Sequence, residues 1–181
     1  TIDDLDPDAI RMAREKYTER HERRAKEIES WDDATFLNKA KITRAGKITN
    51  AAIILLGREE SEHFLSPAVC VIRWKLIAKE DKNKDFHNFH VPMIKSVEEI
   101  TTGYIRNNNY VYTVSGNIFP ENMMRYDVFT LREPICNAIG HQDYGMGARI
   151  ELLEYEDEKL VIQNYGQFIP NSVEDVVEKD C

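Results

Sequence analysis

The sequence contains few of the cysteine and histidine residues that form the disulfides of small secreted proteins and the ligands of zinc sites. Its three cysteines, Cys70, Cys136 and Cys181, are widely separated, and no C-x-x-C pair occurs. His87 and His90 have metal-compatible spacing but no third ligand nearby, which favours surface histidines over a zinc site. We therefore expect neither a disulfide framework nor a zinc site, and a reducing cytoplasm is the favoured compartment.

Long apolar runs and targeting signals are also missing. The longest apolar run, residues 51–56, is far shorter than the roughly 20 residues that cross a bilayer, so no membrane partner is expected. The first residues contain no basic segment followed by an apolar one, so we expect no signal peptide there. Because an initiator Met is absent as well, we expect the chain to be an internal fragment of a larger protein.

The chain has no excess of positive charge. Lys and Arg number 24 against 32 Asp and Glu, so the formal net charge is −8. A surface that binds duplex DNA needs clustered cations to displace counterions. The most basic segment, residues 20–27 (RHERRAKE), is interrupted by Glu22 and Glu27, which favours a solvated helix face. We expect DNA contacts only through a domain missing from this chain.

Capping residues predict where several helices begin. The predicted caps are Asp6, Asp32 or Asp33, Thr49, Ser96 and Asp127. Ser96 and Glu99 have the spacing of a capping box for a helix that runs to about residue 106. A last helix is predicted from Pro170 onward.

Strand signals alternate with these helices. Residues 68–78 and 110–114 are β-branched and aromatic, and residues 148–155 and 159–163 form a predicted hairpin. Residues 79–88 are expected to be a charged loop, and in the hairpin Tyr155 is expected to face inward after a slip in the alternation. Hairpin pairing within a mixed order of helices and strands favours an α+β fold over a doubly wound parallel sheet.

The stretch REPICNAIGHQDYG, residues 132–145, combines an apolar helix with polar side chains. Glu133, Asn137 and His141 recur every four residues and therefore share one helix face. The neighbouring stripe can be buried, and it consists of Leu131, Ile135 and Ile139. Carboxylate and amide oxygens suit Mg²⁺ bound to phosphates, and a carboxylate can position an attacking water. From spacing alone, a core helix whose polar residues satisfy nearby backbone groups is the alternative.

The same stretch resembles the R-E-x-x-x-N-A-x-x-H-R-D-Y signature of a bacterial and archaeal family of RecG-related, helicase-like proteins and transcriptional regulators. In that family the signature opens a module similar to the GHKL ATPase fold shared by gyrase B, heat-shock chaperones, histidine kinases and MutL. The segments Asn164-Tyr165-Gly166, residues 31–37 and residues 46–51 resemble further parts of the family. The resemblance thus covers nearly the whole chain.

By position, the resemblance implies that Glu133 is the water-activating carboxylate and that Asn137 binds magnesium. Asn164 takes the place of the adenine-contacting Asp of the superfamily, and Gly166 would allow the backbone to approach the base. His141 and Asp143 of the signature belong to the same expected cofactor-binding set. The implied cofactors are ATP and Mg²⁺.

The implied architecture is a helical and strand middle region that leads into a truncated GHKL-like α/β sandwich with a mixed or antiparallel sheet. Residues 1–30 would form a linker or packing helix, residues 31–93 the middle region and residues 94–181 the ATPase-like module. The expected function is the nucleotide-binding, regulatory portion of a bacterial transcriptional regulator.

Two alternatives remain open, a working Mg-dependent ATPase and a structural homodimerisation module with a vestigial pocket. Three positions count against hydrolysis. Pro134 would bend or break the helix, Gln142 replaces the signature arginine, and Gln167 replaces a second glycine. The lid that would close on the phosphates is expected to lie beyond Cys181, so this piece is predicted to be inactive by itself.

Overall fold

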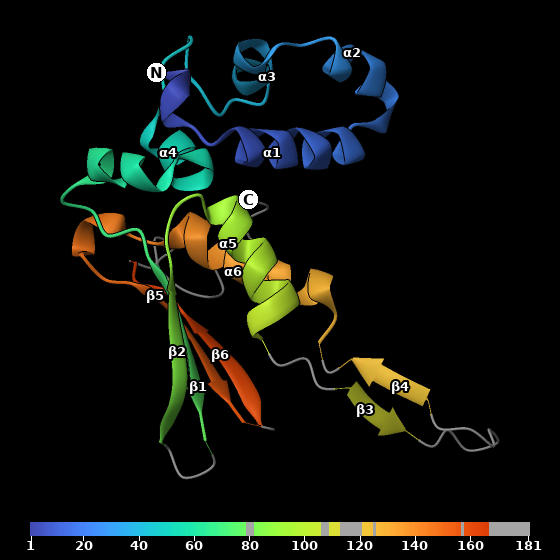
Figure 1. The fold of residues 1–181 in the computed structure, drawn as a ribbon, viewed down its shortest axis with the longest axis vertical. Coiled ribbons are helices and arrows are strands. Elements are labelled where there is room, and N and C mark those ends of the chain that lie inside the picture. Colours follow the sequence, from blue (N-terminus) through green and yellow to red (C-terminus); the bar gives the residue numbers. More distant parts are fainter. Residues whose placement is uncertain (79–81, 106–108, 113–120, 125, 157, 167–181) are drawn as a thin grey trace, which may run out of the picture.

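The computed structural model describes residues 1–78, 82–105, 109–112, 121–124, 126–156 and 158–166. A layer of helices from the first part of the chain lies against α5 and α6, which cover one face of a sheet (Figure 1). The first part contains a 3-10 turn (Ile2–Asp4), α1 (Pro7–Arg20), a 3-10 turn (Glu22–Arg24), α2 (Ala25–Glu29), α3 (Asp33–Lys39), α4 (Asn50–Leu56) and a 3-10 turn (Glu59–Leu65). The second part contains β1 (Ile72–Ile77), β2 (Asn83–Phe89), α5 (Met93–Glu99), a π-helical turn (Ile100–Tyr104), β3 (Asn109–Tyr112), β4 (Glu121–Met124), α6 (Val128–His141), a 3-10 turn (Tyr144–Met146), β5 (Ile150–Tyr155) and β6 (Lys159–Gln163).

The main sheet has the strand order β2-β1-β5-β6 and is mixed. β1 runs parallel to β5, while the β1–β2 and β5–β6 pairs are antiparallel hairpins. β3 and β4 form a separate antiparallel pair that extends away from the body of the molecule (Figure 1). The predicted α+β class and the 148–163 hairpin are confirmed.

Most predicted helix starts are confirmed by hydrogen bonds from the first backbone N–H groups to the capping side chain. These bonds run from Ala9 N to Asp6 (3.0 Å), Thr35 N to Asp32 (2.7 Å), Ala52 N to Thr49 (3.1 Å), and Phe129 N and Thr130 N to Asp127 (2.9 and 3.1 Å). The helix predicted from Pro170 lies outside the described residues.

The basic segment 20–27 is broken by His21, where α1 ends. Its arginines are exposed, and Arg24 Nε donates to Glu27 Oε2 at 2.9 Å. The segment is therefore a solvated surface, as predicted, but it is divided between α1, a 3-10 turn and α2 and does not form one helix face.

The predicted capping box at Ser96 is wrong. α5 begins at Met93, after Pro92, so Ser96 lies inside the helix. Its buried hydroxyl donates to the carbonyl oxygen of His90 at 2.7 Å, which ties the helix to the end of β2. The spacing to Glu99 was fortuitous, because the serine bonds backward to the preceding strand rather than forward to the helix.

The predicted loop at residues 79–88 is also wrong over most of its length. Residues 83–89 form β2, a polar edge strand of which only Phe89 is buried. The composition of this segment did not predict a strand because its side chains are polar. β2 is stabilised instead by its backbone hydrogen bonds with β1. β1 itself, residues 72–77, is shorter than the predicted strand at 68–78.

β5 alternates regularly, so the predicted inward position of Tyr155 is wrong. Ile150, Leu152 and Glu154 are buried, and Tyr155 faces the opposite side of the sheet. Glu154 is only 5% exposed, and its Oε2 accepts a hydrogen bond from Trp74 Nε1 at 2.8 Å. The buried carboxylate of Glu154 is tolerated at this inward-facing position because the indole N–H of Trp74, on β1, donates a hydrogen bond to it.

One hydrophobic core extends from the first helices to the sheet. Leu5, Phe36 and Leu56 of the N-terminal layer belong to the same buried cluster as Ile72 and Leu152 of the sheet. α6 contributes Leu131, Ile135, Ala138 and Ile139. Within the described part of the chain, no helix combines the length and the apolar character needed to cross a membrane.

Replacing Trp74 with Phe is expected to lower the free energy of unfolding by about 2 kcal/mol, because the buried carboxylate of Glu154 loses the indole donor. Urea unfolding followed by circular dichroism measures the change. Trp31→Phe serves as the control, since Trp31 is half-buried in the helical layer. Equal losses in the two variants would show that the Trp74–Glu154 bond adds no stability of its own.

A pH dependence is expected from Asp6, which joins α1 to α5. Burial disfavours its charged form, but a hydrogen bond from Lys95 Nζ at 2.7 Å and the backbone N–H bonds outweigh it and lower the Asp6 pKa. A lowered pKa adds stability above the unfolded-state pKa, and this stability is lost as the pH falls through the folded-state value.

Asp6→Asn keeps a capping oxygen and removes the charge. We expect it to cost up to about 1 kcal/mol at pH 7 and to reduce the further loss of stability below about pH 4. Urea unfolding at pH 7 and pH 3 measures this, with the exposed Asp3→Asn as control. An unchanged acid dependence in Asp6→Asn would contradict the assignment.

Candidate functional site

The polar face predicted on α6 is present and open to solvent. Glu133, Asn137 and His141 are all exposed, whereas Ile135 and Ala138 of the same helix are buried. With a rise of about 1.5 Å per residue, Glu133 and His141 lie about 12 Å apart along the helix axis. α6 therefore presents an elongated polar stripe, with its apolar side in the core.

The segment after β6 returns to the end of this stripe. Asp143 N donates to the carbonyl oxygen of Tyr165 at 2.6 Å, and Tyr165 N donates to Gln142 Oε1 at 2.7 Å. Gln142 Nε2 also donates to the carbonyl oxygen of Ala148 at 2.9 Å. These bonds bring residues 164–166 beside the C-terminal end of α6, so the two predicted parts of the site are neighbours.

Gln142 has a larger structural role than its mismatch to the family signature suggested. It is 7% exposed, and both ends of its amide are used. An arginine has no acceptor atom and could not receive the Tyr165 N–H. In this chain the side chain at position 142 therefore fixes the loops around the stripe.

Gly166 allows a close backbone approach, although to the helix itself. A Cβ atom added at Gly166 would lie 2.7 Å from the carbonyl oxygen of His141. Any larger residue would push the 164–166 segment away from α6. Glycine at this position is explained by packing alone, whether or not a base also stacks there.

Asp143 and Tyr144 close the end of α6. Asp143 Oδ1 accepts from Gly145 N at 3.0 Å and so caps the 3-10 turn that follows. The Tyr144 hydroxyl donates to the carbonyl oxygen of Ile139 at 2.8 Å, and burial raises its pKa above the ordinary value. Both signature residues thus stabilise the local backbone, and the exposed carboxylate of Asp143 already has one partner.

Pro134 lies inside α6 and does not break the helix. The helix runs from Val128 to His141, and Pro134 is exposed on its surface. The missing N–H leaves the Thr130 carbonyl without its usual helical donor. The helix persists because its apolar stripe is buried in the core on the other side.

Glu133 and Asn137 offer two hard oxygen ligands one helical turn apart. The described residues contain no group of three or more His, Cys, Asp or Glu that could hold a metal ion. These two side chains suit a Mg²⁺ ion whose remaining ligands are phosphate oxygens and water. They do not form a cage that would hold the ion by itself.

The side chains of His87 and His90 do not converge on a common site. His87 stacks beside Tyr104, with 4.7 Å between the ring centroids, whereas His90 Nδ1 lies 3.0 Å from Glu62 Oε2. Each histidine thus has its own neighbours.

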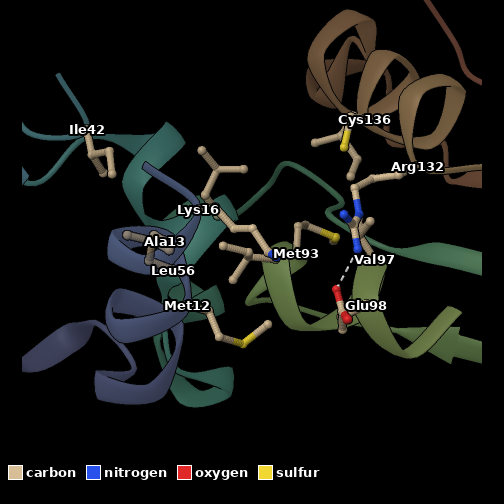
Figure 2. A pocket seen from close by; sticks show the side chains of 13 residues that line it. Met12, Ala13, Lys16, Ile42, Leu56, Met93, Val97, Glu98, Arg132 and Cys136 are labelled. Atoms are coloured by element: carbon tan, nitrogen blue, oxygen red, sulfur yellow. Dashed lines mark hydrogen bonds and ion pairs between the residues drawn. The ribbon is translucent and has the colours of Figure 1, made fainter. Parts of the chain in front are cut away.

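A second feature, which the sequence did not predict, is an apolar cavity of about 220 Å³ between α1, α4, α5 and α6 (Figure 2). Met12 of α1, Met93 of α5 and Cys136 of α6 are among its lining residues. Helical spacing can show which side chains of a helix face inward, but it does not show that packed helices leave a space between them.

Known proteins resemble this chain in part of its sequence and in its fold. Residues 1–72 match the model of DUF8451, a domain of unknown function. The structure is similar to the crystal structure of the DIP2311 protein from Corynebacterium diphtheriae, with a TM-score of 0.68 and 17% sequence identity. The match covers 93% of this chain but only 32% of that one, and at this identity it shows a shared fold alone. No curated protein matches the chain significantly.

Gly166→Ala is expected to destabilise the protein by about 1–3 kcal/mol, because the added methyl group meets the His141 carbonyl. Gly140→Ala is the matched control, since a Cβ atom there meets nothing within 4 Å and alanine is the better helix former. Thermal or urea unfolding of both variants measures the difference. Equal stability of the two variants would contradict the close approach of residue 166 to α6.

Proposed function

We propose that this chain is the nucleotide-binding, regulatory portion of a bacterial transcriptional regulator of the RecG-related, helicase-like family. The observation that carries the proposal is the joining of residues 164–166 to the end of α6 through Gln142 and Asp143. The two stretches that resemble the family are separated in the chain by β5 and β6, yet these hydrogen bonds join them.

On this proposal, ATP lies along the exposed stripe of α6. The adenine base sits at residues 164–166, where the Asn164 side-chain oxygen accepts from its amino group. The phosphates lie toward Asn137, whose amide oxygen would hold Mg²⁺ together with phosphate oxygens. The bound Mg²⁺ would supply charge neutralisation for the phosphates.

Hydrolysis is the second candidate activity, and the position of Glu133 favours it. Glu133 is exposed one helical turn before Asn137 on the same face. A carboxylate there can orient a water molecule and accept its proton beside the terminal phosphate.

The net charge and the free cysteines support two further parts of the proposal, that DNA is bound by another domain and that the protein is cytoplasmic. With a net charge of −8, the chain is unsuited to hold duplex DNA by itself, so DNA binding belongs to another part of the regulator. Cys70 is buried and Cys136 is exposed, and both are free thiols, which favours the cytoplasm.

The test is calorimetric titration of ATP and MgCl₂ into the full-length protein and into its three variants Asn137→Ala, Glu133→Gln and Asn50→Ala. Asn137→Ala should weaken Mg-ATP binding about tenfold, because a ligand to a charged group is lost. Asn50→Ala, an exposed Asn at the start of α4, is the control and should not change it.

Absence of binding at millimolar ATP would refute the nucleotide claim. If ATP binds, phosphate release by the wild type that is lost in Glu133→Gln would establish that the protein is an ATPase. Binding without turnover in the wild type supports a regulatory site only.

A further inference from the structure

The cavity between α1, α4, α5 and α6 is distinct from the polar stripe of α6. Arg132, Cys136 and Ile139 line the cavity, whereas Glu133 and Asn137 point to another side of the same helix. Figure 2 shows Met12 on α1, Met93 and Val97 on α5, and Cys136 on α6 around the space. The cavity therefore lies where the N-terminal helical layer meets the helices that cover the sheet.

The walls are almost entirely aliphatic or sulfur-containing. The Cys136 residue is exposed to solvent, but partial burial of its thiol raises the thiol pKa, so at neutral pH the side chain is uncharged. Leu55, at 38% exposed, is among the lining residues, so the cavity is open toward solvent. Protein interiors are normally packed without such spaces, and apolar walls offer water few hydrogen-bond partners.

Three of the residues that line the cavity are charged, two of them cations and one an anion. Lys16 comes from α1, Arg132 from α6 and Glu98 from α5. Arg132 Nη2 donates to Glu98 Oε2 at 2.8 Å across the gap between the two helices (Figure 2). Lys16 Nζ lies 3.3 Å from an oxygen of the exposed Glu19, a weak surface pair that a ligand can replace.

A pocket with apolar walls and a few polar groups is the usual form of a site for a small amphipathic molecule. We propose that this cavity binds an unbranched aliphatic monocarboxylate of about seven or eight carbon atoms. The chain lies between the methionines and Val97, and the carboxylate meets Lys16 and Arg132.

The length follows from the volume. An apolar cavity of about 150 Å³ takes the six carbons of benzene, so a cavity of about 220 Å³ suits a chain of about eight carbons. The sign of the head group follows from Lys16, because its partner Glu19 is exposed and does not line the cavity, whereas Arg132 is already paired with Glu98. This site does not depend on nucleotide binding, because none of its groups belongs to the polar stripe.

The first experiment titrates butanoate, hexanoate, octanoate, decanoate and dodecanoate into the purified chain by calorimetry. Affinity should rise about fourfold for each added methylene group up to about eight carbons and then level off. No detectable octanoate binding would overturn the proposal and leave the cavity to an apolar side chain of a protein partner. A rise that continues unchanged through dodecanoate would show unspecific adsorption and would also overturn it.

The second experiment tests the head group with octanoate, octanol and octylammonium. Lys16→Met should weaken octanoate binding about two- to fivefold and leave octanol binding unchanged. Lys26→Met, which removes an exposed lysine of α2 outside the cavity, should change neither. Octylammonium binding as tight as that of octanoate would overturn the assignment of an anion.

The third experiment locates the ligand. In the unmodified chain, saturating octanoate should slow alkylation of Cys136 by a maleimide at least fivefold, as measured by peptide mass spectrometry. Ala13→Phe should abolish octanoate binding by filling the cavity, whereas Ala34→Phe, on the exposed side of α3, should not. Octanoate binding with no protection of Cys136 would place the site elsewhere and overturn the proposal.

Discussion

The burial of one side of α6 against the sheet is the interaction on which the rest of the structure depends. Ile135 of α6, Ile72 of β1 and Leu152 of β5 are fully buried members of one core. Because the helix is anchored on this side, its opposite side can carry polar residues and even a proline. The same burial holds β1 and β5 in parallel register under the helix.

From that anchor, hydrogen bonds at the end of α6 organise the surrounding loops. Gln142 and Tyr165 join the helix to the segment that follows β6, and Tyr144 closes the last helical turn. Arg132 and Glu98 join α6 to α5 on the other side. One helix thereby contributes to two surfaces, a polar stripe and the wall of an apolar cavity.

Local chemistry explains which features could be predicted. As helix caps, Asp6, Asp32, Thr49 and Asp127 bond to backbone N–H groups two or three residues ahead, so this role can be predicted from spacing. Ser96 has the same local signal, but its hydroxyl bonds back to His90. A short-range pattern cannot show a competing partner that only the fold brings near.

Long-range pairing explains what could not be predicted. β2 is polar and becomes a strand through its ladder with β1, and Glu154 is buried because Trp74 donates to it across the sheet. In the candidate site, sequence alone determined the exposed stripe of Glu133, Asn137 and His141, since helical periodicity places them together. Only the tertiary structure decided that Gln142 holds residues 164–166 at the end of this stripe and that a cavity opens beside α6. Both features depend on contacts between separate segments of the chain, which local sequence patterns do not reveal.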